Sequence, residues 1–444
     1  MLKFTVLTLS AVLFCRAYLC CEDTDFAGPD NMYSIITEDD VRWFRNEIET
    51  EKFEEYHKLP APDSLMPTVR PDRERMSKVE LEGGLGRCND GSNPVYYLSY
   101  GDEPTKWVIF FEGGDWCSRY DDIGDKDDRR NCVRRRNKGG LQGGTTRDDP
   151  GDLSLNSIGA SYGQLDPDPD RNPLMHAWNK VYVRNCDGSS FTSGLEGIKR
   201  VDGTVLYFRG KAILDEVLRD LNDNKHLGYA TEVVVAGCSA GGASVFIHAD
   251  AVHEAIKQKA RELGRSDAEA IKLVGFADSG FFHYYSGGPD DCDYIKRMQF
   301  VYQEMNSTAG LQPACLGAYE EPQRHKCLFG EIAIHFTRAP VFVVQSVQDG
   351  WQLAWVNCGV DSRNDEFGDS MWSAIEVATW RPKNGAFVDA CQHHCHCYES
   401  IFIDGVSQAE AFRRFYLGEG RQRIWRKRTC DNELDSRECP LKRG

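Results

Sequence analysis

The sequence predicts an α/β protein with a mostly parallel central sheet and helices on both of its faces. Three observations lead to this prediction. Short apolar runs rich in β-branched residues recur along the chain, and helical patterns lie between them. One such run, 233–236, enters a Gly-Cys-Ser-Ala-Gly turn that opens a helical segment. Strands that alternate with helices are typical of parallel sheets joined by crossover helices.

The expected elements follow one another between residues 106 and 345. Five apolar runs are expected strands: Lys106–Phe111, Lys180–Arg184, Glu232–Ala236, Lys272–Ala277 and Pro340–Gln345. Two segments with helical periodicity are expected helices: Thr204–Leu221 and Gly241–Leu263. No internal repeat is visible.

Composition and charge narrow the class of protein. The chain has 444 residues, of which 41% are hydrophobic and 27% charged, as in soluble globular proteins with a sizeable core. Its net charge is −16. Such a surface repels phosphate backbones, so we expect no nucleic-acid partner.

The first 17 residues have the pattern of a signal peptide. Lys3 precedes the apolar stretch Phe4–Phe14, and Ala17 offers a small residue for cleavage. A membrane span needs about 20 apolar residues, so we expect no stable membrane insertion. Cleavage after Ala17 would leave 16 of the 17 cysteines. In a secreted protein we expect these mostly as disulfides, whose pairing the sequence does not reveal. Asn306-Ser307-Thr308 is a candidate glycosylation site.

We divide the rest of the chain by composition. Residues 18–75 are a polar, proline-containing extension with one candidate helix at 41–56, residues 76–430 are the expected catalytic domain, and 431–444 are a tail. Charged residues are dense in an insertion at about 118–173. A mobile cap over the site is one interpretation, but a solvated surface excursion pinned by Cys132 is favoured.

Ser239 is the candidate nucleophile. The G-x-S-x-G turn places a serine hydroxyl at the end of a sheet, and Gly237 and Gly241 allow the following helix to pack closely. The N-terminus of that helix favours developing negative charge. A chance glycine-serine turn is the alternative, which the strand before it and the helix after it disfavour.

A serine nucleophile needs a base and an orienting acid, which sheet hydrolases place in the order Ser, acid, His. Asp349 follows the strand at 340–345, and Asp278 follows the strand at 272–277. The candidate bases His393, His394 and His396 lie in the cysteine-rich segment 391–397. A zinc site in this segment is disfavoured, because adjacent ligands diverge and the cysteines of an exported chain are oxidised.

An oxyanion hole is expected after the first of these strands. Phe111-Glu112-Gly113-Gly114-Asp115 ends that strand with two glycines whose amides can turn toward a substrate. The amide of Ala240, directly after Ser239, would supply a further donor. Each such donor is typically worth about 3 to 4 kcal/mol of transition-state stabilisation.

Taken together, these motifs resemble the pectin acetylesterase and Notum carboxylesterase family, which has an α/β-hydrolase fold. The resemblance covers about residues 80–425. It rests on Phe-Glu-Gly-Gly-Asp-Trp-Cys at 111–117, Val-Arg-Asn-Cys-Asp-Gly-Ser-Ser-Phe-Thr at 183–192, Phe-Arg-Gly at 208–210, Gly-Cys-Ser-Ala-Gly-Gly at 237–242, Ala-Asp-Ser-Gly-Phe-Phe at 277–282, Gln-Asp-Gly-Trp-Gln at 348–352 and Cys-Gln-His-His-Cys at 391–395.

The resemblance implies a serine carboxylesterase that needs no cofactor or metal. It favours Asp349 as the acid and His394 as the base, with an oxyanion hole at Gly114, Asp115 and Ala240. Plant-like members carry glycine where this chain has Asp115, so we expect that carboxylate to point away from the oxyanion, toward Arg119.

The resemblance leaves the substrate open. O-acetyl groups on a polysaccharide are the first expectation, and a fatty acyl group on a protein is the alternative. Five aromatic residues are candidates for an acyl pocket, although aromatic residues at strand ends more often belong to the ordinary core: Trp116, Phe281, Phe282, Tyr284 and Tyr285. Two other classes remain, a non-catalytic binding protein on a hydrolase scaffold and a metal-binding secreted protein.

Overall fold

The computed structural model describes residues 72–120, 130–287, 294–358, 365–398 and 400–430, and the structural statements below concern these ranges. The expected signal peptide, the candidate helix at 41–56, nearly all of the polar extension and the tail at 431–444 lie outside them. Among the described helices, none combines the length and the hydropathy that a membrane span requires.

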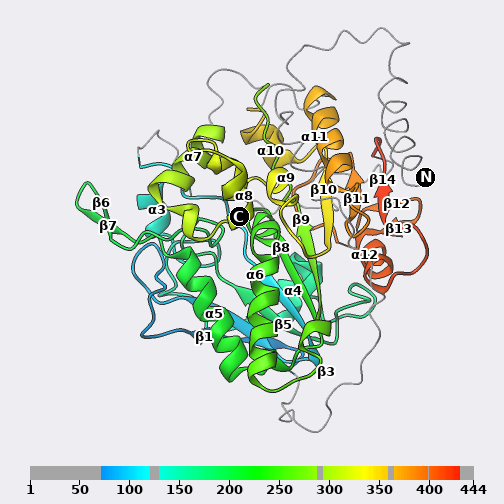
Figure 1. The fold of residues 1–444 in the computed structure, drawn as a ribbon, viewed down its shortest axis with the longest axis horizontal. Helices are drawn as coiled ribbons and strands as arrows, with labels where there is room; N and C mark the ends of the chain where they lie inside the picture. Colours follow the sequence, from blue (N-terminus) through cyan, green and yellow to red (C-terminus); the bar gives the residue numbers. More distant parts are fainter. Residues whose placement is uncertain (1–71, 121–129, 288–293, 359–364, 399, 431–444) are drawn as a thin grey trace, which may run out of the picture. The chain divides into compact units, whose positions relative to one another are not determined.

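A single ten-stranded sheet forms the centre of the described part of the chain (Figure 1). Its strand order is β14-β11-β10-β9-β8-β3-β5-β2-β1-β4. Neighbours from β14 to β5 pair in parallel, and β2, β1 and β4 continue antiparallel. The strands are β1 Arg75–Glu80, β2 Val95–Ser99, β3 Glu103–Phe111, β4 Asp152–Ser154, β5 Trp178–Val183, β8 Glu232–Cys238, β9 Lys272–Asp278, β10 Val341–Ser346, β11 Gly385–Asp389 and β14 Ile424–Arg426. The predicted α/β-hydrolase fold class is confirmed.

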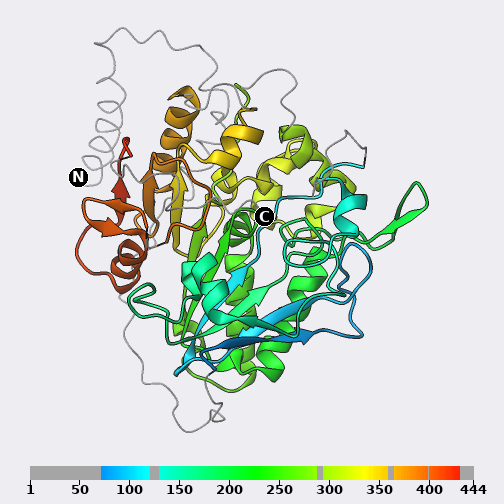
Figure 2. The ribbon, with the colours of Figure 1, turned by 180° about the vertical axis from the view of Figure 1, so that it is seen from behind.

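Helices cover both faces of this sheet (Figures 1 and 2). On one face, α6 (Ala240–Glu262) packs along β8 and β9, and α5 (Gly210–Asn224) and α9 (Gly330–Ala333) pack against α6. On the other face, α4 (Leu155–Ser161) and α12 (Gln408–Leu417) share a core with alternate strand residues such as Phe110 and Phe276. This alternation follows from the period of two along a strand.

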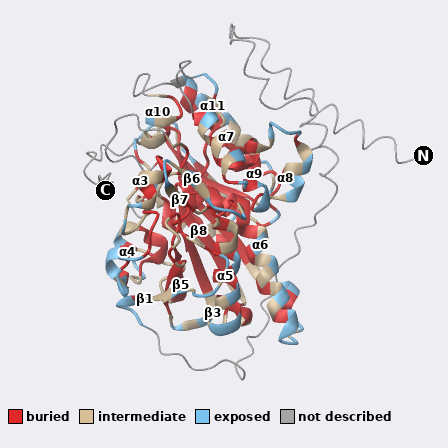
Figure 3. Cartoon of the chain, turned by 90° about the vertical axis from the view of Figure 1, so that its left-hand side faces the viewer, coloured by how far each residue is buried: buried red, intermediate tan, exposed pale blue. Residues whose placement is uncertain are grey.

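Burial follows the same layering (Figure 3). The central strands are buried along nearly their whole length, and exposed residues lie on the outer faces of the helices. The remaining helices are α3 Cys132–Arg136, α7 Tyr294–Glu304, α8 Pro313–Ala318, α10 Gly350–Trp355 and α11 Asp365–Ala378. Two small hairpins are β6 Lys199–Val201 with β7 Thr204–Leu206 and β12 Phe402–Ile403 with β13 Val406–Ser407.

One predicted helix begins later than expected. Residues 204–206 of the expected helix Thr204–Leu221 form β7, and the helix α5 starts at Gly210. The two residues between β6 and β7, Asp202 and Gly203, have φ angles of 46° and 80°. Positive φ at both central residues is what a two-residue type I′ hairpin turn requires, and this turn chemistry outweighs the helical pattern.

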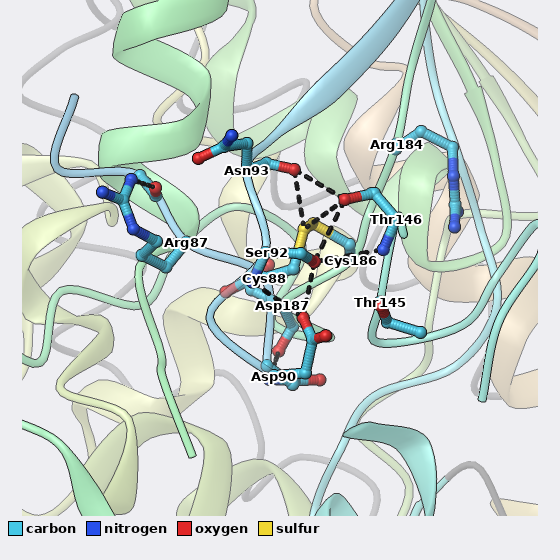
Figure 4. The surroundings of a disulfide bond; sticks show 12 residues. Arg87, Cys88, Asp90, Ser92, Asn93, Thr145, Thr146, Arg184, Cys186 and Asp187 are labelled. Carbon is cyan, nitrogen blue, oxygen red and sulfur yellow. Dashed lines mark hydrogen bonds between the residues drawn. A yellow bond between two sulfur atoms is a disulfide. The ribbon is translucent and has the colours of Figure 1, made fainter. Parts of the chain in front are cut away.

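The charged insertion differs from the solvated excursion that we favoured. Its strand β4 joins the main sheet, and Arg135, Thr146 and Asp149 are buried. Thr146 donates to the carbonyl of Asn93 at 2.7 Å, beside the disulfide that joins Cys88 to Cys186 (Figure 4). The described part of the insertion is therefore packed into the domain, and a Cys117–Cys132 disulfide pins its start.

Five disulfides join described residues: Cys88–Cys186, Cys117–Cys132, Cys238–Cys395, Cys315–Cys327 and Cys391–Cys430. Two of them hold the C-terminal histidine segment, one at each side of His394. The expectation of extensive disulfide bonding is thus confirmed for these cysteines.

Candidate active site

The predicted site residues meet at one edge of the sheet. Ser239 directly follows β8, Asp349 lies three residues after β10, and His394 lies five residues after β11. The glycine loop at 113–115 begins two residues after β3, the neighbour of β8. Because these strands are parallel, their carboxyl ends meet at one edge of the sheet, which is where α/β proteins bind ligands.

Ser239 occupies a sharp strand-to-helix turn. Its φ and ψ angles are 59° and −127°, a conformation that L-residues rarely adopt. Its N–H donates to the carbonyl of Asp278 at 2.9 Å, and its own carbonyl accepts from Ala243 at the start of α6. Backbone strain of this kind persists where the surroundings enforce it, and it is typical of a nucleophile elbow.

Close packing explains the glycines around the turn. A Cβ atom on Gly237 would lie 2.3 Å from the carbonyl oxygen of Gly241, and one on Gly241 would lie 2.0 Å from that of Phe111. A Cβ on Gly113 would lie 2.6 Å from the carbonyl oxygen of Cys238 and 3.2 Å from Cβ of Ser239. The glycine loop after β3 therefore packs directly against the serine turn.

Asp349 and His394 form a hydrogen-bonded pair. Nδ1 of His394 lies 2.8 and 2.9 Å from the two carboxylate oxygens of Asp349. Asp349 is fully buried and caps α10, accepting from the N–H of Gln352 at 2.9 Å. This contact leaves the proton of the imidazole on Nδ1, so the lone pair on Nε2 is free to accept a proton.

A disulfide brings the serine and the histidine together. Cys238 directly precedes Ser239, Cys395 directly follows His394, and the two cysteines are bonded with their Cα atoms 5.9 Å apart. Nε2 of His394 is buried and has no hydrogen-bond partner among the described residues. Catalytic hydrogen bonds are often long without substrate and tighten in the substrate complex.

The rival candidates have different partners. Nε2 of His393 lies 3.0 Å from Asp389, and Nδ1 of His396 donates to the carbonyl of Ser161. Burial acts to lower the pKa of His393, but the carboxylate of Asp389 outweighs it and raises that pKa. Asp278 accepts from Oγ of Ser279, and burial raises the pKa of its carboxyl.

The same segment offers no metal centre within the described ranges, where no group of three or more potential ligands converges. Cys391 and Cys395 are bonded to Cys430 and Cys238, and Cys397 is also oxidised. Thiolate ligands are therefore absent from the segment, and its three histidines point to separate partners.

The glycine loop presents free backbone donors near Ser239. Gly114 and Asp115 have φ angles of 104° and 66°, and no intramolecular bond from their N–H groups is found in the described structure. Ala240 is the first residue of α6, whose leading N–H groups have no intrahelical acceptor. Arg135 is fully buried and donates to the carbonyl of Gly114 at 2.7 Å. Since a trans peptide points its C=O and N–H in opposite directions, this bond turns the N–H of Asp115 away from Arg135.

The carboxylate of Asp115 folds back onto its own chain. It accepts from the N–H of Trp116 at 2.7 Å rather than making the contact with Arg119 that we expected. Burial raises the pKa of this carboxyl, and the charges of Arg130, Arg297 and Arg135 oppose that rise. The hydrogen bond to its neighbour occupies the N–H of Trp116, so that amide is not an oxyanion donor.

A buried ionic network lies beneath the glycine loop. Arg184 pairs with Glu112 and donates to Asp149 at 2.7 Å, and all three side chains are excluded from solvent. Glu112 also accepts from Tyr182 at 3.0 Å and from the N–H of Gln142 at 2.7 Å. The network fixes the residue before Gly113 and joins the charged insertion to the sheet.

Comparison with known proteins identifies the family. The model of the family described as Pectinacetylesterase matches residues 79–419. The chain belongs to the pectinacetylesterase family. The resemblance inferred from the motifs is thereby confirmed.

Similar proteins include both groups that the motifs indicated. Pectin acetylesterase 7 of Arabidopsis thaliana is 27% identical over 335 residues, which cover 69% of this chain and 76% of the relative. Pectin acetylesterase 5 of the same plant is 27% identical over 382 residues, covering 77% and 78%. Palmitoleoyl-protein carboxylesterase notum2 of Xenopus laevis is 26% identical over 362 residues, covering 76% and 67%. This pectinacetylesterase family member is a carboxylic ester hydrolase, as predicted.

Aromatic rings surround His394 in this family member. Trp116 and Phe282, both predicted pocket residues, have ring centroids 4.7 Å apart, and the Phe282 ring lies 6.5 Å from that of His394. Phe281 instead packs against Phe246 of α6. Tyr285 contacts Phe367, and Tyr284 contacts Phe329, whose ring lies 5.6 Å from that of Tyr294.

Sequence reasoning missed part of the ring cluster. The ring of Trp351 is stacked on that of His394 at 6.1 Å and contacts Phe282 at 5.3 Å. Tyr294 completes the cluster by contacting Trp116 at 6.2 Å. Trp351 stands two residues after Asp349 in the Gln-Asp-Gly-Trp-Gln motif. Its closeness to the candidate acid was the sequence signal that could have placed it at the site.

A second serine–histidine–acid array was also missed. His283 lies 2.6 Å from Glu331 through Nδ1 and 2.8 Å from Oγ of Ser370 through Nε2. Ser370 lies inside α11, where its backbone N–H belongs to the helix. It therefore lacks the exposed turn and adjacent donors that support Ser239.

Proposed function

We propose that this protein is an acetylesterase that removes O-acetyl groups from a polysaccharide by an acyl-enzyme mechanism. One observation carries the proposal. Ser239 stands in a nucleophile turn that a disulfide ties to the histidine paired with a buried aspartate. The names of the plant relatives support acetyl esters as the substrate.

In the proposed mechanism, Oγ of Ser239 attacks the ester carbonyl while Nε2 of His394 takes the hydroxyl proton. The N–H groups of Gly114, Asp115 and Ala240 stabilise the oxyanion of the tetrahedral intermediate. The histidine then protonates the departing alcohol, and water releases the acyl group by the same steps. Asp349 holds the imidazole in the required tautomer and stabilises its charged form.

The ring cluster supports a short acyl group. Four rings in mutual contact, those of Trp116, Phe282, Tyr294 and Trp351, fill space beside His394. A long acyl chain needs an apolar channel at this place. Removal of a fatty acyl group from a protein, which the name of the Xenopus relative describes, is the competing function.

We further propose that the protein is exported. Five disulfides among the described residues support this, because disulfides persist in oxidising compartments. Sequencing the N-terminus of protein secreted from an expressing cell tests export and the cleavage site together. Retention of the whole chain inside the cell would contradict it.

Two measurements test the proposed function. Ser239→Ala should abolish hydrolysis of p-nitrophenyl acetate, whereas Ser370→Ala, the matched change in the second array, should leave it nearly unchanged. The wild-type protein should also prefer the acetyl ester over the octanoyl ester. Preference for octanoate would favour the fatty-acyl alternative, and full activity of Ser239→Ala would exclude the nucleophile.

A further inference from the structure

Two buried glutamines flank the carboxylate of Asp349. Gln345 is the penultimate residue of β10, and Gln352 is the third residue of α10. Both are fully excluded from solvent. A buried amide needs partners for its oxygen and its nitrogen, so the contacts of these two side chains decide what they do.

One glutamine holds the carboxylate through its side chain and the other through its backbone. Nε2 of Gln345 donates to Oδ2 of Asp349 at 3.0 Å, and the N–H of Gln352 donates to Oδ1 at 2.9 Å. His394 supplies the remaining bond. In the described structure, Gln345 is thus the one side chain other than His394 that is hydrogen-bonded to this carboxylate.

The side-chain oxygen of Gln345 and the whole side-chain amide of Gln352 hold the loop that carries Phe282. Oε1 of Gln345 accepts from the N–H of Phe281 at 3.1 Å. Oε1 of Gln352 accepts from the N–H of His283 at 3.1 Å, and its Nε2 donates to the carbonyl of Phe281 at 3.3 Å. The residues on both sides of Phe282 are therefore fixed by the groups that fix Asp349.

The partners of Gln345 permit a single orientation of its amide. A flipped amide would turn its oxygen toward the Asp349 carboxylate and its NH2 group toward the N–H of Phe281. Both contacts would be repulsive, because they pair acceptor with acceptor and donor with donor. The side chain of Gln345 is consequently a rigid bridge from the catalytic acid to the Phe282 loop.

We propose that Gln345 is a positioning residue that couples the orientation of Asp349 to the loop lining the acyl site. The inference rests on the proposed function, because it matters only if Asp349 orients His394 for catalysis. A carboxylate held at both oxygens keeps the Nδ1–H of His394 as its donor and so leaves Nε2 as the base of the proposed mechanism. The same bridge places the Phe282 ring beside that histidine, so acyl binding and base orientation share one support.

The decisive variant is Gln345→Glu, which keeps the size and shape of the side chain. A protonated glutamic acid can still donate to Asp349 and accept from Phe281, whereas its ionised form places a second carboxylate against Asp349. Burial and the neighbouring charge make this glutamate ionise above its ordinary range. We expect kcat/KM of the variant to fall at least tenfold relative to wild type by pH 9, as the introduced glutamate ionises.

Gln408→Glu is the matched control. Gln408 is a buried glutamine at the start of α12, on the other face of the sheet, and its Nε2 has no hydrogen-bond partner among the described residues. Its variant should keep the wild-type pH profile, with no falling limb up to pH 9. Thermal melting of each variant at every pH separates loss of activity from unfolding.

Gln345→Met supplies a second test that does not depend on ionisation. It retains volume but removes the hydrogen bonds of the amide to Asp349, to Phe281 and to the carbonyl of Ser346, so kcat should fall about 10- to 100-fold with little change in KM. A wild-type pH profile for Gln345→Glu together with unchanged kcat for Gln345→Met would overturn the inference. Failure of the proposed function is distinct, because it would show as esterase activity that survives in Ser239→Ala.

Discussion

The two sides of the active site are held by different kinds of interaction. On the base side, residues 341–352 and 385–396, two disulfides tie the segment 385–396 to Cys238 and Cys430, and neutral amide groups of Gln345 and Gln352 hold the carboxylate of Asp349. On the oxyanion side, residues 111–117, 135–149 and 182–190, the backbone rests on the buried charges of Glu112, Arg184 and Arg135.

Because the two sides are held differently, substitutions on each side should have different effects. During the proposed reaction a positive charge forms on His394, and neutral dipoles can orient its partner without competing with that charge. The proposed oxyanion donors are backbone N–H groups, so that side needs only a fixed backbone, and the buried charges hold the backbone in place. Loss of a buried ionic partner is strongly destabilising. We therefore expect base-side changes to lower the rate and oxyanion-side changes to lower stability.

The largest expected effect is on the base side. Asp349→Asn preserves the shape of the acid but lets the imidazole adopt the wrong tautomer, so kcat should fall by about 10⁴-fold, as when a serine-hydrolase triad loses its acid. Steady-state kinetics on p-nitrophenyl acetate measures this, and the melting temperature should change little. A loss below tenfold would remove Asp349 from the proposed mechanism.

The next largest effect is expected on the oxyanion side, where it should be a loss of stability. Arg184→Met leaves Glu112 and Asp149 as buried carboxylates without their cation, which should cost about 3–5 kcal/mol of unfolding free energy. Urea unfolding measures it. Arg428→Met is the control, because Arg428 and Asp369 form an exposed pair and its loss should cost under about 1 kcal/mol. Equal effects of the two variants would contradict the account of the oxyanion side.

A third prediction compares the Cys238–Cys395 disulfide, which ties the serine turn to the histidine segment, with a disulfide outside the active site. The double variant Cys238→Ala/Cys395→Ala frees the neighbours of Ser239 and His394, so kcat should fall about 10- to 100-fold, the effect of a displacement near 1 Å. Cys315→Ala/Cys327→Ala removes a disulfide between α8 and the following helical turn. Both pairs should lose stability, typically about 2–5 kcal/mol. If both pairs also lost the same fraction of kcat, the Cys238–Cys395 bond would have no special role.

The smallest effect concerns Asp278, the rival acid. Because burial raises the pKa of Asp278 above its unfolded value, its contribution to stability is present at low pH and is lost as the pH rises through the folded value. Asp278→Asn never ionises, so it should gain stability relative to wild type as the pH increases, while kcat stays within a few-fold. Urea unfolding at pH 5 and pH 8 tests the sign. Loss of activity comparable to Asp349→Asn would restore Asp278 as the acid.

On the base side, the sequence predicted the candidate catalytic residues but not the residues that hold them in place. Strands near 340 and 232 are apolar runs bounded by turn residues, and chain order placed Ser239 and Asp349 after such runs. The strand before His394, β11, was not predicted, and the family resemblance selected that histidine. Gln345 is the polar residue in an otherwise apolar strand, a signal that could have marked it. The pairing of Cys238 with Cys395 depends on how the strands assemble, which no local pattern records.

The oxyanion side shows more clearly what could not be predicted from the sequence. The run Arg134-Arg135-Arg136 was interpreted as part of a solvated face, yet Arg135 is buried against the carbonyl of Gly114. Charge runs are usually solvated, and what overrides that rule here is the set of carbonyls that the fold brings to one point. Tertiary context of this kind is absent from the sequence pattern.

The central claim is that Ser239 is the nucleophile activated by His394 and Asp349. Covalent labelling with diethyl 4-nitrophenyl phosphate, followed by mass spectrometry of the peptides, tests it most directly. We expect one equivalent of label on Ser239, loss of esterase activity in proportion to labelling, and much slower labelling of Asp349→Asn. Label on Ser370, or an active enzyme that takes up no label at Ser239, would contradict the account.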